Sequence, residues 1–146
     1  MNKKPNPYMR RQARFLLVQA LYQWLMTGAN IREIETQFLS NEKNLKKLDI
    51  TYFQELLHAI PQSIDEIETL FIPYLDRPIK QIDPIALTIL RLSCYELRAR
   101  IDIPYRVIIN EALELAKIFG AEESYKYVNS IIDRISKSVR SIEYQS

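Results

Sequence analysis

The chain has 146 residues, of which 47% are hydrophobic and 26% charged, with a formal net charge of +2. This balance is typical of a globular domain that buries a core and excludes an intrinsically disordered chain. Charged or polar residues interrupt every hydrophobic stretch before it reaches eighteen residues, which excludes a transmembrane helix. No apolar signal segment follows the basic N-terminus, so we expect a cytoplasmic protein.

The residue counts leave little room for common catalytic chemistry. Cys94 is the only cysteine, His58 the only histidine, and Gly28 and Gly120 are the only glycines. These residues cannot form a disulfide, a four-ligand zinc site or a glycine-rich phosphate loop. We therefore expect no metal, no cofactor and no enzymatic activity, and we predict Cys94 to be a buried apolar residue.

The first third of the chain predicts a tail and two helices. Residues 1–8 contain two prolines and are predicted to be a flexible tail, followed by one domain over residues 9–140. Apolar residues at spacings of three and four predict a helix over about 9–26 that Gly28 ends. Asn30 is a candidate N-cap for a short helix after it.

The next helical segment is interrupted by a proline. Asp49 is predicted to cap a helix that carries Phe53 and Ile60, and Pro61 either bends or ends this helix. Ser63 with Glu66 predicts a capping box for a renewed helix.

The C-terminal half carries the clearest helix boundaries. Asp83 and Pro84 are the N-cap and first residue of a helix that runs to about Ala99, and this helix is apolar on most sides, as expected at the centre of a bundle. Pro104 opens the next helix, Gly120 closes it, and a last helix spans about residues 122–139. No strand periodicity occurs, so we predict an all-α fold of five to seven helices.

Positive charge is concentrated at the start of the chain. Residues 1–14 hold five basic and no acidic residues, so the remainder carries a net charge of −3. On a helix, Arg10, Arg11 and Arg14 share one side with Tyr22, an arrangement that suits phosphates and an unpaired base of single-stranded RNA. In the alternative interpretation Tyr22 belongs to the core.

Two further segments are candidates for binding. One surrounds the start of the last helix, where lysines and tyrosines suit a phosphate or a base, although acids there also simply favour the helix dipole. Its residues are Lys117, Glu123, Lys126 and Tyr127. The other is a charged edge of the central helix, which either docks a protein or forms intramolecular ion pairs. Its residues are Arg91, Tyr95 and Arg98.

Several stretches resemble the NusB family of transcription antitermination factors. They are PYRVIINEALELAKIFG at 104–120, YVNSIID at 127–133, RRQAR at 10–14 and QALY at 19–22. The resemblance extends over about residues 9–138. Gln12 departs from it, standing where the family often has an arginine, and so do Ile109 and Ser130.

The resemblance implies an all-helical fold of about six to seven helices in two packed subdomains. It also implies binding of the boxA element of ribosomal RNA leaders together with NusE, a small-subunit ribosomal protein, to promote read-through of terminators by RNA polymerase. Matched by position, Arg10, Arg11, Arg14, Tyr22 and the segment 123–127 correspond to RNA-binding positions. The edge at Arg91, Tyr95 and Arg98 corresponds to the side that faces NusE.

Two other hypotheses remain at the sequence level. NusB-like domains also precede the catalytic domain of RNA cytosine methyltransferases, but this sequence contains neither a cofactor-binding fold nor a catalytic cysteine motif. A helical module that forms a homodimer, and so masks its RNA surface, is the second alternative.

Overall fold

The computed structural model describes residues 6–41, 43 and 45–144, and these form eight α-helices and three short 3-10 helices without a strand. The all-α prediction is confirmed, with more helices than expected because α4 is separate from α3 and a four-residue helix follows α7. The chain divides into two compact units, Met1–Gln62 and Ser63–Ser146. The prediction of one domain over 9–140 stays a prediction.

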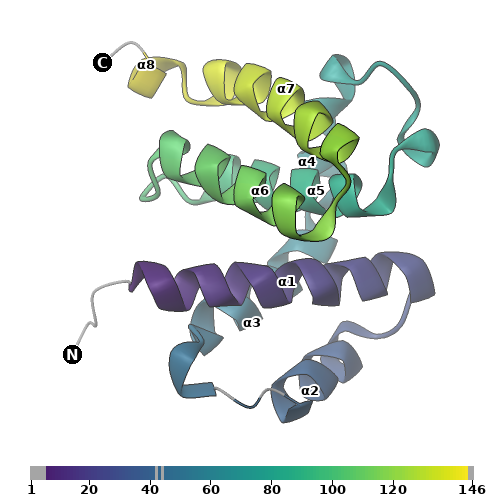
Figure 1. The fold of residues 1–146 in the computed structure, drawn as a ribbon, viewed down its shortest axis with the longest axis vertical. Coiled ribbons are helices and arrows are strands. Elements are labelled where there is room, and N and C mark those ends of the chain that lie inside the picture. The colour runs from purple at the N-terminus through teal and green to yellow at the C-terminus, as the bar shows by residue number, and fades with distance from the viewer. Residues whose placement is uncertain (1–5, 42, 44, 145–146) are drawn as a thin grey trace. The chain divides into compact units, whose positions relative to one another are not determined.

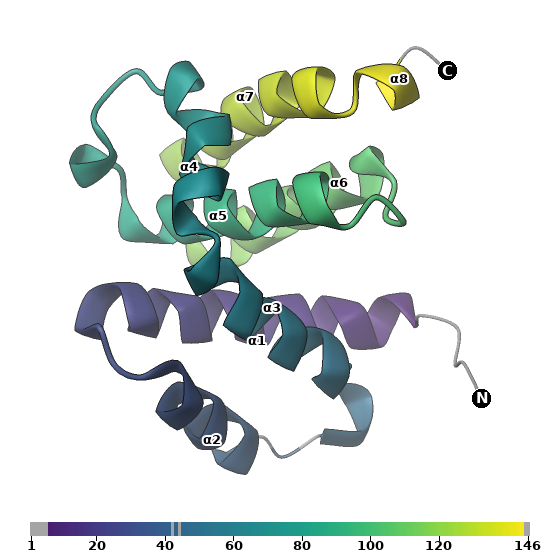
Figure 2. The same ribbon diagram turned by 180° about the vertical axis from the view of Figure 1, so that it is seen from behind.

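The first unit contains α1 (Pro7–Thr27), α2 (Ile31–Asn41), the 3-10 helix η1 (Leu45–Lys47) and α3 (Ile50–Gln62). Helix α1 contacts both α2 and α3 (Figures 1 and 2). Apolar side chains on its inner side, such as Leu17 and Val18, are fully buried, as are Phe53 and Leu56 on α3. The predicted boundaries at Gly28, Asn30 and Asp49 are confirmed.

The predicted tail is too long at its C-terminal end. Residues 1–5 lie outside the described residues, but Pro7 is already the first residue of α1. The Asn6 side chain accepts hydrogen bonds from the backbone N–H groups of Tyr8 and Met9, and so caps the helix. Proline is favoured at the first helical position because its missing N–H would be unpaired there.

Pro61 lies inside α3, which ends one residue later at Gln62. A proline is tolerated there because only the last turn loses a hydrogen bond. The capping box predicted at Ser63 is wrong, since the Ser63 side chain makes no capping hydrogen bond. Its backbone, at φ −115° and ψ 17°, lacks the extended conformation that directs an N-cap side chain towards the helix.

The second unit contains α4 (Ile64–Phe71), η2 (Ile72–Tyr74), η3 (Ile79–Gln81), α5 (Pro84–Ala99), α6 (Tyr105–Phe119), α7 (Glu122–Val139) and α8 (Ser141–Tyr144). Helix α5 contacts α4, α6 and α7, so its predicted position at the centre of a bundle is confirmed (Figure 1). Cys94, on α5, is fully buried as predicted.

Candidate nucleic-acid interface

The three arginines near the start of α1 have different surroundings. The Arg10 guanidinium lies 4.2 Å from the centroid of the Tyr52 ring, and the Arg14 guanidinium lies 5.7 Å from the same centroid. Arg14 is only 2% exposed, whereas Arg11 is exposed to solvent. Of the three, Arg11 is therefore the one that is placed to meet a ligand in this conformation.

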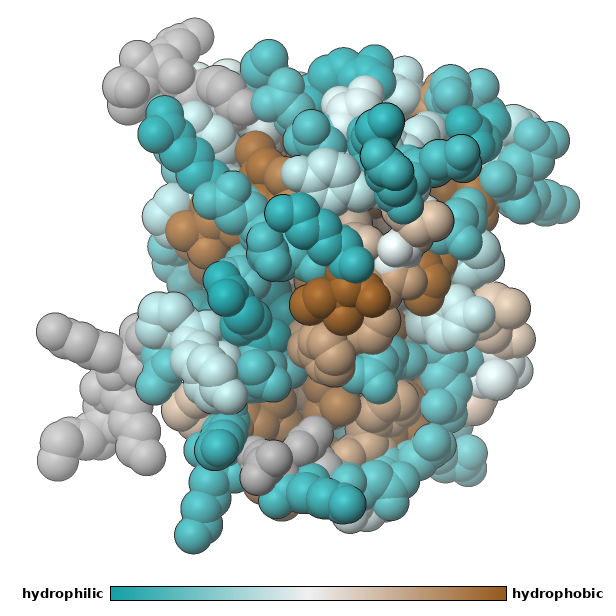
Figure 3. Space-filling model, viewed as in Figure 1, coloured by the Kyte–Doolittle hydropathy of each residue, from teal (hydrophilic) through white to brown (hydrophobic). Residues whose placement is uncertain are grey.

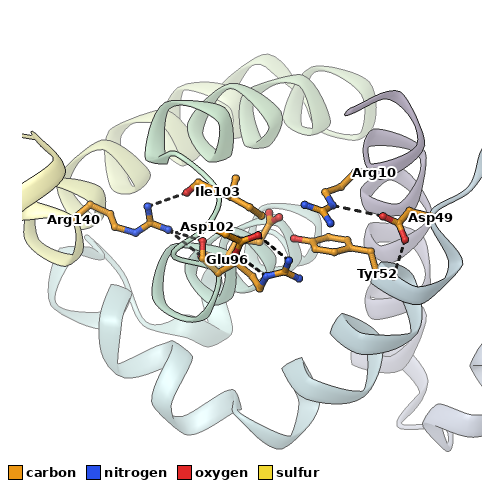
Figure 4. Close-up of polar contacts among 8 residues, drawn as sticks. Arg10, Asp49, Tyr52, Glu96, Asp102, Ile103 and Arg140 are labelled. Carbon is orange, nitrogen blue, oxygen red and sulfur yellow. Dashed lines mark hydrogen bonds and ion pairs between the residues drawn. The ribbon is translucent and has the colours of Figure 1, made fainter. Parts of the chain in front are cut away.

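Arg10 and Arg14 help to hold α1 against α3. Besides lying over Tyr52, Arg10 is 3.7 Å from the Asp49 carboxylate (Figure 4). Asp49 in turn accepts a hydrogen bond from the backbone N–H of Tyr52 at 3.1 Å and donates its own N–H to the Met9 carbonyl. Desolvated cation–π contacts strengthen such a cluster. Tyr52 thus brings together two of the predicted arginines.

Tyr22 is half-buried on α1, two turns beyond Arg14. Its side chain is neither fully buried nor fully exposed, so both predicted roles, a core residue and a surface for an unpaired base, fit part of its environment.

In the second unit, the segment around the start of α7 exposes its lysines. Lys117 lies 3.5 Å from the Glu114 carboxylate and 5.4 Å from the centroid of the Tyr125 ring. The Lys126 side chain is 74% exposed and lies 3.8 Å from Glu122. Because exposed ion pairs of this kind are weak, a phosphate can replace the carboxylate at little cost.

Tyr127 takes part in a cluster that sequence reasoning missed. The Arg77 guanidinium lies 4.8 Å from the centroid of the Tyr127 ring, and Arg77 also pairs with Asp76 at 2.8 Å. Burial and the adjacent Asp76 raise the pKa of the Tyr127 phenol, and the hydrogen bond from Arg77 lowers the pKa of Asp76. Arg77 follows a 3-10 turn far from Tyr127 in the sequence, so no local pattern predicts their contact.

This cluster borders a small cavity of about 160 Å³. Glu123 and Ser124 at the start of α7 also line it, and Ser124 Oγ lies 3.4 Å from Asp83, the N-cap of α5. The predicted residues Glu123 and Tyr127 therefore lie at one cavity, whereas Lys117 and Lys126 do not line it.

The predicted partner surface on α5 is built around two ion pairs with α4. Arg91 contacts Glu68 at 2.7 Å with only 12% of its side chain exposed. Arg98 pairs with Glu66, and its side chain is 45% exposed. Tyr95 lies between Arg91 and Arg98 in the sequence, and its side chain is half-buried. The intramolecular pairing considered from the sequence therefore occurs, and Arg98 remains accessible.

The described residues contain no cluster of three metal-ligating side chains and no helix that is long and apolar enough to cross a membrane. Burial raises the pKa of the Cys94 thiol. A thiol with a raised pKa is a poor nucleophile because the thiolate is the reactive form.

The fold and these surfaces define an all-helical protein of two small units that exposes basic and aromatic side chains on each. The model of the NusB family matches residues 11–137. The transcription antitermination protein NusB of Alcanivorax borkumensis is 45% identical over 143 residues, covering 98% of this chain and 95% of the relative. The protein of the same name from a Marinomonas species is 47% identical over 141 residues, covering 95% of this chain and 81% of the relative. The chain belongs to the NusB family.

A solved structure agrees with this assignment. NusB of T. maritima matches with a TM-score of 0.77 and 28% identity, covering 99% of this chain and all of the other. The resemblance found in the sequence motifs is thereby confirmed at the level of the fold.

Proposed function

We propose that the chain is a transcription antitermination factor that binds boxA RNA of ribosomal RNA leaders together with NusE. The observation that carries this proposal is the similarity, over nearly the whole chain, to relatives named transcription antitermination protein NusB. In this role the protein works in the cytoplasm as a non-catalytic adaptor, and the resulting complex helps RNA polymerase to pass terminators.

The exposed cations act as phosphate contacts in this proposal. Arg11 on α1 and Lys117 and Lys126 in the second unit bind phosphates of the unpaired strand. Arg10 and Arg14, through Tyr52, hold α1 in place, and Arg10 adds positive potential beside the strand. Neutralising about three phosphates gives a slope of about −2 for the logarithm of affinity against the logarithm of salt concentration.

Aromatic side chains supply the contacts to bases. Tyr22 and Tyr127 are both half-buried, so each is held in place while part of it remains accessible. Glu123, at the cavity beside Tyr127, is an acceptor for a base amino group. One stacked base contributes about 1–3 kcal/mol, so tight binding requires several contacts or a partner.

NusE is the proposed partner at the α5 surface. Arg98 and Tyr95 are accessible enough to contact another protein, while Arg91, through Glu68, orients this part of α5 against α4. A second protein extends the RNA-binding surface and raises the affinity without any new contact from this chain.

A titration of fluorescent boxA RNA with the full chain, alone and with NusE, tests the proposal. We expect a preference for boxA over a scrambled RNA of the same composition, and an affinity at least about tenfold higher with NusE. Light scattering reports whether a homodimer forms and dissociates when RNA is added. Equal affinity for boxA and scrambled RNA in the presence of NusE would contradict the proposed function.

A further inference from the structure

A pocket in the first unit is not explained by the surfaces described above. It has a volume of about 460 Å³ and lies between α1, α2 and the segment at η1. Its size is within the range of sites that bind small organic groups. The lining side chains are Tyr8, Gln12, Phe15, Leu16, Gln19, Gln37, Phe38, Asn41, Lys47 and Leu48.

Three aromatic side chains around this pocket are incompletely covered. Tyr8 is 55% exposed, and Phe15 and Phe38 are half-buried. In the space-filling view, hydrophobic side chains reach the surface between hydrophilic ones over α1 and α2, in the lower part of Figure 3. Aromatic rings at a surface offer flat apolar faces on which a planar ligand stacks.

Side-chain amides supply the polar part of the lining. Gln37 is paired with Gln23 at 3.0 Å, and the Gln19 amide donates to the Phe15 carbonyl. By contrast, the side-chain amides of Gln12 and Asn41 have no hydrogen-bond partner among the described residues. An amide presents a donor and an acceptor side by side, which is the pattern that pairs with the edge of a nucleobase.

The charge around the pocket is positive. Among the residues that the structure describes, no carboxylate lines the pocket, and Lys47 is exposed at one side. Arg11 is exposed four residues before Phe15, so the two are neighbours on the surface of α1. Lys46 is also exposed next to Lys47. An occupant that continues into a chain of phosphates is attracted by this basic rim, whereas a basic partner would be repelled by it.

We propose that this pocket receives one unpaired nucleobase of the bound RNA strand. The base stacks against Phe15, its edge pairs with the Gln12 and Asn41 amides, and the adjoining phosphates contact Arg11 and Lys47. A purely apolar peptide side chain would bury the same amides without partners, which is unfavourable. The proposal rests on the proposed function, because it needs an RNA strand on the first unit.

The test uses the full chain with NusE and boxA RNAs that carry the fluorescent base 2-aminopurine at one position each. Stacking against an aromatic ring quenches this base, so we expect one position to be quenched by the wild type and not by Phe15→Leu. Gln12→Ala should weaken binding of unlabelled boxA RNA by about 5- to 100-fold, the range that corresponds to losing one amide contact to a base edge. Gln54→Ala, which changes an exposed glutamine on α3, is the matched control. Circular dichroism confirms that each variant is folded.

The possible results distinguish a failure of the pocket proposal from a failure of the proposed RNA-binding function. If Gln12→Ala and Phe15→Leu bind boxA RNA within twofold of the wild type, and Arg11→Ala does not, the base pocket is wrong and the RNA-binding function stands. If the wild type binds no RNA with NusE, both are wrong. If an apolar peptide or a second copy of the chain, rather than RNA, protects Phe15 and Phe38 in hydrogen exchange, the pocket proposal is also overturned.

Discussion

At the scale of single residues, Arg140 shows how a charged side chain can stabilise the second unit from within. Arg140 is 7% exposed and lies after the last residue of α7. Its guanidinium donates to the carbonyl oxygens of Leu97, Ile103 and Arg100 at 2.8–2.9 Å and to Glu143 at 2.7 Å. Figure 4 shows its bond to Ile103. Leu97 lies in the last turn of α5, and Arg100 and Ile103 follow it. Backbone oxygens at a helix C-terminus have no helical partner and attract a cation.

Replacing Arg140 with alanine should destabilise the protein by about 3 kcal/mol, because several buried carbonyls lose a charged donor. Urea denaturation measures this change. Lys137→Ala is the control: Lys137 pairs with Asp133 on the exposed side of α7 and should change stability by less than about 0.5 kcal/mol. Equal effects of the two substitutions would show that the Arg140 contacts do not stabilise the fold.

Glu143, which pairs with Arg140, makes the stability of the fold depend on pH. Its carboxylate accepts the backbone N–H of Tyr105 at 2.9 Å, and this bond, together with Arg140, lowers its pKa below the ordinary value of 4.5. A carboxyl whose pKa is lower in the folded state stabilises the fold above the ordinary pKa, and this stabilisation is lost as the pH falls through the lowered value.

Glu143→Gln should therefore reduce stability at neutral pH and make stability less dependent on pH below about 4.5. Denaturation at a series of pH values between neutrality and pH 3 measures this. A Glu143→Gln variant whose stability follows the wild-type pH curve in parallel would rule out the linkage. Glu33→Gln, on the exposed side of α2, serves as a control.

At the scale of helices, the two glycines end their helices for different physical reasons. Gly28 has φ 68°, in the left-handed region, and an added Cβ would meet no atom within 4 Å. Gly120 has φ −105°, which any residue adopts, but an added Cβ would lie 3.0 Å from the Ala116 carbonyl oxygen and 3.0 Å from Ser124 Cβ. Backbone conformation requires the first glycine, and close packing of α6 against the start of α7 requires the second.

Alanine at either position should consequently destabilise the protein, whereas asparagine should be better tolerated than alanine only at Gly28. Gly28→Ala should cost about 1 kcal/mol and Gly28→Asn less, since asparagine tolerates the left-handed region. At Gly120, alanine should cost about 1–3 kcal/mol and asparagine at least as much, because both add a Cβ to a crowded site. Thermal unfolding of the four variants measures these differences, and a Gly120→Asn variant more stable than Gly120→Ala would contradict the packing argument.

The helix ends also show how far local sequence patterns can predict structure. Caps at Asn30, Asp49 and Asp83 are formed by atoms a few residues apart, so the sequence alone predicts them. The prediction at Ser63 is wrong because its backbone lacks the extended conformation of an N-cap, which the residue types alone do not reveal. The class of fold and most helix boundaries were predictable for the same local reason.

The surroundings of the candidate site residues were less predictable. The sequence places three arginines on one side of α1 but gives no sign that Tyr52, on another helix, covers two of them. The contact of Arg77 with Tyr127 and the ion pairs of Arg91 and Arg98 likewise join residues far apart in the chain. Such contacts depend on tertiary packing, which the periodicity of apolar residues along a helix does not predict.

At the scale of the whole molecule, RNA that binds only the folded protein must stabilise it. A ligand at one hundred times its dissociation constant adds about 2.7 kcal/mol to the free energy of unfolding. We expect boxA RNA with NusE to raise the midpoint of thermal unfolding, and scrambled RNA at the same concentration to raise it less. Differential scanning fluorimetry measures both, and identical shifts would indicate binding without sequence preference.

The salt dependence of boxA binding tests the central claim most directly, namely that exposed cations of this helical scaffold bind the phosphates of an RNA strand. Affinity is measured from low to physiological salt for the wild type, Arg11→Ala and Arg32→Ala, which changes an exposed arginine on α2. The account predicts that Arg11→Ala lowers affinity and reduces the steepness of the salt dependence by about 0.7, the value for one lost phosphate contact on a single strand, while Arg32→Ala matches the wild type. An Arg11→Ala variant with the affinity and salt dependence of the wild type would contradict it.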